Sequence, residues 1–200
     1  MTQRLRICGI RLAVLCFLAS ATSISLAQVP VVKFTTEDSS VKFAVKASVA
    51  INGSFDKWDA TLVFTSTDVT TGVLDIKIQA DSVNTGSGMK DGKLKSKDFF
   101  NADQVPLITF LSTKIVQTGP NTFEVVGDFT IRGASKPQTL TLILSGKGTG
   151  TGEIHGTMVF DRKDYGMNKG IPFVHIGDSV DVTVDLKGNR ISGPPLVFKQ

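Results

Sequence analysis

Cysteine is almost absent from this sequence outside its first 27 residues. The chain of 200 residues has two cysteines, and both lie in residues 1–27. That segment has the features of a secretory signal peptide: early arginines, the apolar run LAVLCFLASA, and small residues before cleavage sites after Ala21 or Ala27. An uncleaved membrane anchor is the alternative, although the apolar run is short for one. We therefore expect residues 28–200 to be an exported domain without disulfide bonds or thiolate metal sites, located in a bacterial periplasm or secreted beyond it.

Excess charge is also absent once the signal segment is set aside. The whole chain has 22 basic and 18 acidic side chains. Three of the arginines lie in residues 1–27, which leaves 19 basic against 18 acidic side chains in residues 28–200. This near balance gives no support to nucleic-acid binding, so we predict no nucleic-acid partner.

Motifs for catalysis and metal binding are scarce. The chain has two histidines, His155 and His175, and no serine in a G-x-S-x-G motif. The glycines of GKGTGTG at 146–152 lack the spacing of a phosphate-binding loop, so they indicate a hairpin turn. In DRKDYG we expect a local ion pair between Arg162 and Asp164, with no calcium loop. We predict no catalytic residue, no metal and no cofactor apart from a bound lipid; a zinc site with both histidines is the weaker alternative.

The sequence is rich in period-two alternation of apolar and polar residues. Leu74, Ile76 and Ile78, for example, alternate with charged or amide side chains. Such alternation is typical of strands with one buried face. Turn signals separate the strands, among them Asn52-Gly53 and the stretch 133–137. The predicted strands are 31–36, 40–48, 54–65, 73–82, 106–117, 122–132, 138–146, 153–163 and 178–188.

Many antiparallel strands with one apolar face each build either a sandwich or a closed barrel. Phenylalanine favours the barrel. Twelve of the 13 phenylalanines lie in residues 28–200, and five are within predicted strands: Phe43, Phe64, Phe110, Phe129 and Phe160. We therefore predict an all-β, eight-stranded antiparallel barrel, whose lumen is either filled by side chains or open to one apolar ligand.

The stretch SGMKDGKLKSKDFF is the clearest break in the alternation. We predict a short helix that Ser87 caps, with Met89 and Leu94 facing inward and the lysines outward. Phe99 and Phe100 then lie in a tight turn, and burial of each ring gains about 1.5–3 kcal/mol. The segment is interpreted as a lid over one end of the barrel; a plain hydrophobic plug without a ligand is the alternative.

Several blocks of the sequence, in order along residues 28–200, resemble the YceI-like family of exported, lipocalin-like proteins that bind polyisoprenoids or other lipids. These blocks are SSVKFAV, KDGKLKSKDFFNADQVPLITFLST, GDFTIRGASKPQTL, DRKDYGM and GDSVDVTVDL. The resemblance implies an eight-stranded barrel with a long apolar tunnel, helical segments near its mouth, and a long-chain lipid as ligand. Two positions depart from the family pattern, Lys90 in place of an arginine and Ala47 in place of a histidine, so a head-group contact at either is expected to differ here.

Together the pattern and the resemblance predict a protein that binds or carries an isoprenoid or fatty-acid lipid. The head-group candidates are Lys90, Lys93 and Arg132. An alternative is a periplasmic stress or interaction protein that docks a membrane or redox partner; transient membrane contact and a homodimer stay open. The candidate lining residues are Phe43, Val45, Leu74, Ile76, Ile78, Phe99, Phe100, Phe110, Phe129, Leu142 and Phe160.

Overall fold

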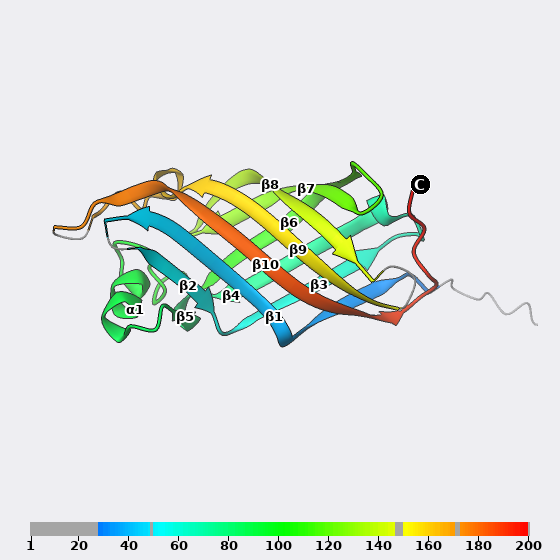
Figure 1. Cartoon of the computed structure of the whole chain (residues 1–200), viewed down its shortest axis with the longest axis horizontal. Coiled ribbons are helices and arrows are strands. Elements are labelled where there is room, and N and C mark those ends of the chain that lie inside the picture. The colour runs from blue at the N-terminus through cyan, green and yellow to red at the C-terminus, as the bar shows by residue number, and fades with distance from the viewer. Residues whose placement is uncertain (1–27, 49, 147–149, 171–172, 200) are drawn as a thin grey trace, which may run out of the picture.

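A closed antiparallel barrel is the architecture of the computed structural model (Figure 1). The structure describes residues 28–48, 50–146, 150–170 and 173–199. The predicted signal peptide and the centre of the predicted turn at 146–152 therefore lie outside the described residues. Among the described residues, no helix combines the length and the apolar character needed to cross a membrane.

Eight strand positions close the barrel, because β10 pairs back with β1. Two of these positions are interrupted: β2 and β3 run one after the other along β1, and β5 continues the line of β4. The predicted eight-stranded barrel is thus confirmed. Its strands are β1 (Val31–Ala47), β2 (Ile51–Phe55), β3 (Trp58–Phe64), β4 (Gly72–Gln79), β5 (Val83–Asn84), β6 (Leu107–Gln117), β7 (Thr122–Ile131), β8 (Ala134–Ser145), β9 (Thr151–Asp161) and β10 (Ile176–Ser192).

Short helical elements complete the fold. α1 (Gly88–Lys95) lies at one end of the barrel, and the C-terminal residues lie at the opposite end (Figure 1). Three 3-10 turns connect strands: η1 (Val69–Thr71), η2 (Ala80–Ser82) and η3 (Arg162–Tyr165). A helix at one end of the barrel is therefore observed, and it distinguishes the two ends, the helix end and the tail end.

The seam between β1 and β10 is the longest pairing of the barrel. The two strands predicted at 31–36 and 40–48 are one strand in the structure, with an irregular register between Thr35 and Ser40. Asp38 adopts a φ of 59° there. A bulge explains why the alternation breaks in the sequence although the strand continues.

One predicted turn is wrong, and another is shorter than predicted. Asn52 and Gly53 lie within β2, where Gly53 pairs with Phe43. A Cβ at Gly53 would come within 2.7 Å of the Phe43 Cζ, so glycine is needed here to admit the ring, not to turn the chain.

The second corrected turn is the stretch 133–137. The observed turn consists of Arg132 and Gly133, which have φ of 55° and 79°, as a two-residue hairpin turn requires. Pro137 lies in β8 opposite Asp128, and β8 pairs with β9 only from Thr141 onward. Proline is tolerated because this part of the strand has a partner on one side only.

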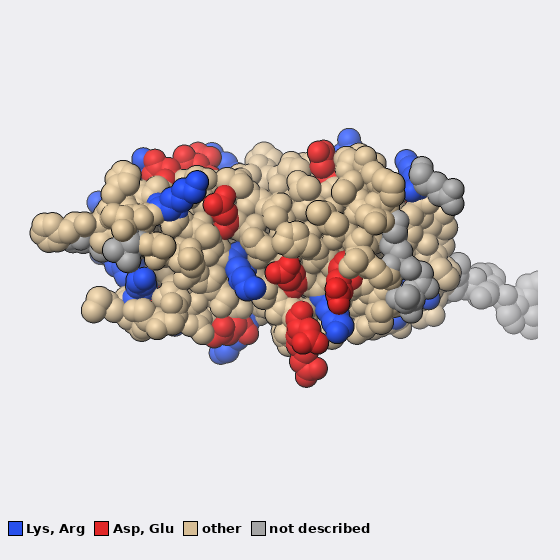
Figure 2. Space-filling model, in the orientation of Figure 1, with Lys and Arg blue, Asp and Glu red and all other residues tan. Residues whose placement is uncertain are grey.

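The barrel surface carries mixed charge, whereas its interior is apolar. Basic and acidic side chains are interspersed over the face that Figure 2 shows, in keeping with the near balance of the two signs. On β7 and β9 the buried residues alternate with partly or fully exposed ones along most of the strand. The core is therefore one continuous apolar cluster inside the barrel.

Candidate functional site

Described residues of the barrel interior line two apolar cavities. One has a volume of about 70 Å³ and lies beside α1; we call it the helix-end cavity. The other has a volume of about 140 Å³ and lies beside residues 193–199; we call it the tail-end cavity. They share no lining residue.

Aromatic rings close the helix-end cavity. Phe100 packs against Phe55 at a ring-centroid distance of 5.7 Å and against Phe43 at 6.2 Å. Leu94 of α1 and Phe99 are also buried and line this cavity. The predicted burial of the phenylalanine pair is confirmed, and the pair comes to lie at one end of the barrel.

Two details of the predicted helix are wrong. Met89 is 87% exposed instead of facing inward. Ser87 is at the N-cap position but makes no capping hydrogen bond with its side chain. Asp91 anchors the start of α1 instead. Its carboxylate accepts hydrogen bonds from the backbone N–H and the hydroxyl of Thr85 at 2.8 Å and 2.6 Å. These bonds lower the pKa of Asp91.

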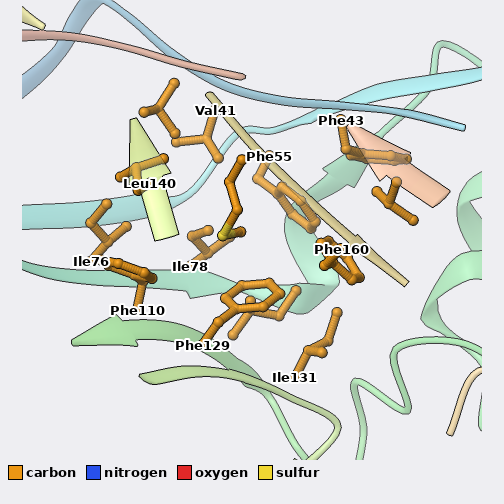
Figure 3. Packing of buried hydrophobic residues seen from close by; sticks show 14 of the residues in the cluster. Val41, Phe43, Phe55, Ile76, Ile78, Phe110, Phe129, Ile131, Leu140 and Phe160 are labelled. Carbon is orange, nitrogen blue, oxygen red and sulfur yellow. The ribbon is translucent and has the colours of Figure 1, made fainter. Parts of the chain in front are cut away.

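A layer of buried side chains, which we call the waist, separates the two cavities. On β4, β6, β9 and β10 an inward-facing residue that lines neither cavity lies between residues that line one and residues that line the other; on β3 and β8 one buried residue each lines neither cavity. Figure 3 shows three of them, Ile76, Phe110 and Leu140, on one side of the interior. The waist residues are Ala60, Ile76, Phe110, Leu140, Met158 and Val184.

Glycine in the barrel wall lets the waist pack tightly. A Cβ at Gly156 would lie 2.5 Å from a methyl group of Val184 and 2.8 Å from one of Leu142. At Gly127 it would lie 2.8 Å from the ring of Phe110. Neighbouring side chains therefore occupy the space over both glycines, and the tunnel implied by the resemblance is divided in this structure.

The eleven predicted lining residues are all buried, but they belong to three places. Leu74 and Leu142 line the tail-end cavity. Ile76 and Phe110 lie in the waist. A direct role in ligand binding stays a prediction for all eleven residues. The remaining seven line the helix-end cavity: Phe43, Val45, Ile78, Phe99, Phe100, Phe129 and Phe160.

The predicted head-group candidates line neither cavity. Lys93 forms an ion pair with Asp98 at 2.7 Å and lies 5.8 Å from the centre of the Phe99 ring. Lys90 makes a long hydrogen bond of 3.4 Å to the carbonyl of Ala50. These contacts place both lysines on the outer surface of the helix end.

Arg132, the third candidate, joins loops at the same end. Its guanidinium donates to the backbone carbonyls of Lys97, at 2.9 Å, and Gly166. Its Nε is buried without a hydrogen-bond partner. Arg132 therefore holds the loop after α1 against the loop after η3.

Arg162 is an arginine of the helix-end cavity whose role the sequence did not reveal. It is 6% exposed. Its donors reach the carbonyls of Gly177 at 3.0 Å, Lys169 at 3.2 Å, Ile176 at 3.4 Å and also Met167.

Asp178 is the carboxylate that pairs with Arg162, at 3.0 Å. Among the described residues no ion pair joins Arg162 to Asp164, so that predicted pair is wrong. Five acceptors match the five N–H groups of a guanidinium, which leaves Arg162 no donor for a ligand. A hydrogen bond from Lys163 lowers the pKa of Asp178 and keeps it charged.

Arg190 is the corresponding residue at the tail end. The inward-facing series on β10 runs from Val180 through Gly188 to Arg190, and Arg190 lines the tail-end cavity opposite Val32. Within the described part of the chain its guanidinium has no hydrogen-bond or ion-pair partner. The sequence carries one signal for Arg190. The alternation of inward-facing and outward-facing residues in β10 continues past residue 188 and places Arg190 on the inner face.

The two histidines lie apart from both cavities. His155 is on the outer face of β9, and its Nδ1 lies 2.7 Å from the Asp185 carboxylate. His175 is exposed in the loop before β10. The described residues contain no group of three side chains that could hold a metal ion.

Sequence comparison identifies related proteins over most of the barrel. The model of the family described as "YceI-like domain" matches residues 33–188. A UPF0312 protein of Pseudomonas savastanoi pv. phaseolicola is 26% identical over 143 residues, which cover 69% of this chain and 73% of the relative. Protein YceI of Escherichia coli O17:K52:H18 is 33% identical over 96 residues, 48% of this chain and 50% of that protein.

Structural comparison finds the same barrel in solved proteins. BcnA of Burkholderia cenocepacia superposes with a TM-score of 0.70 at 25% identity, over 77% of this chain and 98% of BcnA. A polyisoprenoid binding domain from Saccharophagus degradans superposes with a TM-score of 0.62 at 13% identity, over 80% and 98% of the two chains. The second likeness is one of fold alone.

Proposed function

This chain belongs to the YceI-like domain family, and we propose on that premise that its barrel binds and carries the apolar chain of an isoprenoid or fatty-acid lipid. The observation that carries the proposal is the tail-end cavity, an apolar space in which Arg190 is the one charged residue among the described lining residues. Each methylene that moves there from water gains about 0.8 kcal/mol. The polyisoprenoid binding domain named above adds support through its shared fold.

The cavity volumes set the length of chain that binds without rearrangement. An apolar cavity of about 150 Å³ holds one benzene ring. The tail-end cavity, at about 140 Å³, therefore holds a chain of similar size, such as one isoprene unit. In our proposal a longer chain displaces waist side chains and extends into the helix-end cavity.

The proposed role is non-enzymatic and lies in the periplasm. Among the described residues the charged groups of the two cavity linings are Lys42, Arg162 and Arg190, so no acid or base converges on a bound chain. Export rests on the predicted signal in residues 1–27. Cell fractionation tests it: the mature protein is expected in the periplasmic fraction, and retention in the cytoplasm contradicts export.

Native mass spectrometry of the purified protein tests lipid binding. We expect a lipid adduct, or uptake of an added fluorescent isoprenoid. Leu142→Trp fills the tail-end cavity and should abolish uptake. Ile143→Trp is the matched control, because the adjacent Ile143 faces outward and is 50% exposed. No uptake by the parent protein, or equal uptake by both folded variants, counts against the proposal.

Docking to an anionic bilayer is a second candidate function, and exposed apolar residues at the helix end favour it. Met89 of α1 and Phe173 in the loop before β10 are exposed, Phe173 completely so. That loop lies at the same end of the barrel as α1 (Figure 1). Lys97 and Lys169 are close enough to lower the pKa of Asp98, after the larger effect of Lys93. Apolar tips among lysines fit a membrane surface that carries negative lipids.

Vesicle sedimentation separates the two candidates. The double variant Met89→Ser, Phe173→Ser should lose binding to vesicles of phosphatidylcholine with phosphatidylglycerol and keep isoprenoid uptake. Unchanged sedimentation, or sedimentation that does not depend on phosphatidylglycerol, contradicts docking.

A further inference from the structure

We infer that the tail-end cavity is the opening of the barrel, that Arg190 there selects a lipid with an anionic head group, and that residues 193–199 are a strap that lifts to admit it. This inference rests on the proposed lipid binding and specifies the head group and the route. The head group is a carboxylate or a phosphate, the two anions whose oxygens match the planar fork of arginine.

Three residues of the strap close the tail-end cavity. Pro195, Leu196 and Phe198 line it. The Phe198 ring packs edge-on against Phe123 of β7 at a centroid distance of 6.3 Å. The strap is therefore the cover of the larger cavity, as Phe99 and Phe100 are of the smaller one.

Hydrogen bonds of Val197 and Lys199 attach the strap to described residues of the barrel. Val197 exchanges backbone hydrogen bonds with Thr67 and Val69 at 2.8 Å and 3.4 Å. The side-chain amide of Gln117 bonds the backbone of Lys199 at 2.8 Å and 2.9 Å. The bonds between Gln117 and Lys199 lie at the surface and Val197 is 62% exposed, so water can replace these contacts while the barrel stays intact.

Arg190 lies where a head group would remain after the chain enters. It is half-buried at the inner face of β10, and its neighbours in the lining are uncharged. Among the described residues no carboxylate pairs with it. A cation without a partner at an apolar mouth is unfavourable, and a bound anion supplies the missing partner. Arg162 cannot do the same at the other end, because its donors are already used.

Arg190 and the strap lie outside the part of the chain that the family model matches. The match covers residues 33–188, whereas Arg190 and the strap follow it. The inference therefore rests on the structure of this chain and not on the family match.

Calorimetry with octanoate, octyl phosphate and octanol tests the head group. These probes share one chain length and differ in charge. We expect both anions to bind more tightly than octanol, Arg190→Gln to weaken anion binding about tenfold and leave octanol unchanged, and Arg190→Lys to recover part of the loss. High salt should weaken the anions alone in the parent protein, which tests the charge without a variant. Equal affinity for the three probes, or equal weakening of all by Arg190→Gln, overturns the anion contact.

Stopped-flow exchange of a fluorescent fatty acid tests the strap. Phe198→Ala removes a ring that closes the cavity and should raise the rates of uptake and release about tenfold each. Val197→Ala is the matched control, because this neighbour is 62% exposed and lines neither cavity. Equal rates for both variants and the parent overturn the strap as a gate.

The site of binding distinguishes failure of this inference from failure of the proposed function. In backbone NMR, octanoate should shift the signals of Gly152 and Gly188, which line the tail-end cavity. Shifts confined to Ile78 and Val180 of the helix-end cavity would overturn the inference and preserve lipid binding. Absence of binding by all three probes and by the fluorescent lipid would overturn both.

Discussion

The two ends of the barrel are closed in different ways. At the helix end, Arg132 holds the loop before Phe99 through the carbonyl of Lys97, and the buried donors of Arg162 hold the loop between η3 and β10. At the tail end, a single extended strap crosses the larger cavity and is attached by surface hydrogen bonds. The difference indicates that one end is part of the folded core and the other is a removable cover.

The two lumen-facing arginines show the same contrast. Arg162 is saturated by backbone carbonyls and Asp178, so it stabilises a structure. Arg190 has no such partner among the described residues, so its charge is available to a ligand. Residue type alone does not separate a structural arginine from a binding one; the number of acceptors around it does.

The largest expected effect is a difference in the free energy of unfolding between variants of Arg162 and Arg190. Arg162→Met leaves buried carbonyls without donors and should lower the free energy of unfolding by about 3–5 kcal/mol. Arg190→Met removes no described bond and should change it by less than about 0.5 kcal/mol. Urea denaturation measures both, and similar losses would remove the contrast between the ends.

A smaller effect is expected at the waist, which keeps the two cavities apart. Met158→Ala removes a buried side chain that lines neither cavity and should cost about 3 kcal/mol. The new space joins the cavities, so the variant should bind longer chains than the parent protein in a series of fatty acids. Val159→Ala on the outer face is the control. An unchanged chain-length preference in a folded Met158→Ala protein would show that the waist does not limit the ligand.

Paired leucine substitutions compare the two covers directly. Leu94→Ala in α1 should lower the free energy of unfolding by about 2 kcal/mol, because Leu94 is buried against the barrel end. Leu196→Ala in the strap should cost less than about 1 kcal/mol, since Leu196 is only half-buried. Thermal unfolding of the two variants measures the difference; a larger loss at Leu196 would reverse the comparison.

The smallest expected effect is a response to acid at the helix end. Hydrogen bonds from Lys93 and Lys163 lower the pKa values of Asp98 and Asp178, respectively, from an ordinary value of 3.8. A carboxyl with a lowered pKa in the folded state contributes stability that is complete above pH 3.8 and is lost as the pH falls through the folded pKa. Amide exchange should therefore show a weakening of α1 below pH 3.8.

The tail end offers a control for this titration. Asp68 also has a lowered pKa, but the main cause is the backbone N–H of Thr70, not a lysine. High salt should mimic acid at the helix end and leave the turn at Asp68 unaffected. Equal salt sensitivity at both ends would contradict this assignment of causes.

Much of the fold was predictable because alternation is a local property of the chain. Strand β7 was predicted at 122–132 and is observed at Thr122–Ile131, with the expected face inward. The helix of 88–95 was also foreseen, yet Met89 was placed on the wrong side. A short helix with two glycines has no clear apolar stripe, so packing against the barrel decides which residue is buried.

The candidate site was less predictable than the fold. Leu74 and Leu142 were identified as lining residues, whereas Arg190 and the strap were not. The strap has no alternation of its own; its place depends on Phe123 and Gln117, which lie far away in the sequence. Arg162 was assigned to a neighbour in the sequence, but its partners come from the next strand and loop.

By itself the sequence determined the strands, their apolar faces and hence an antiparallel barrel with an oily interior, since each strand carries its own pattern. Only the tertiary structure decided where that interior is empty. The space over Gly156, for instance, is occupied by Val184 and Leu142 from the two neighbouring strands. A void is what remains after side chains from distant positions have met across the barrel, so no local pattern can encode it.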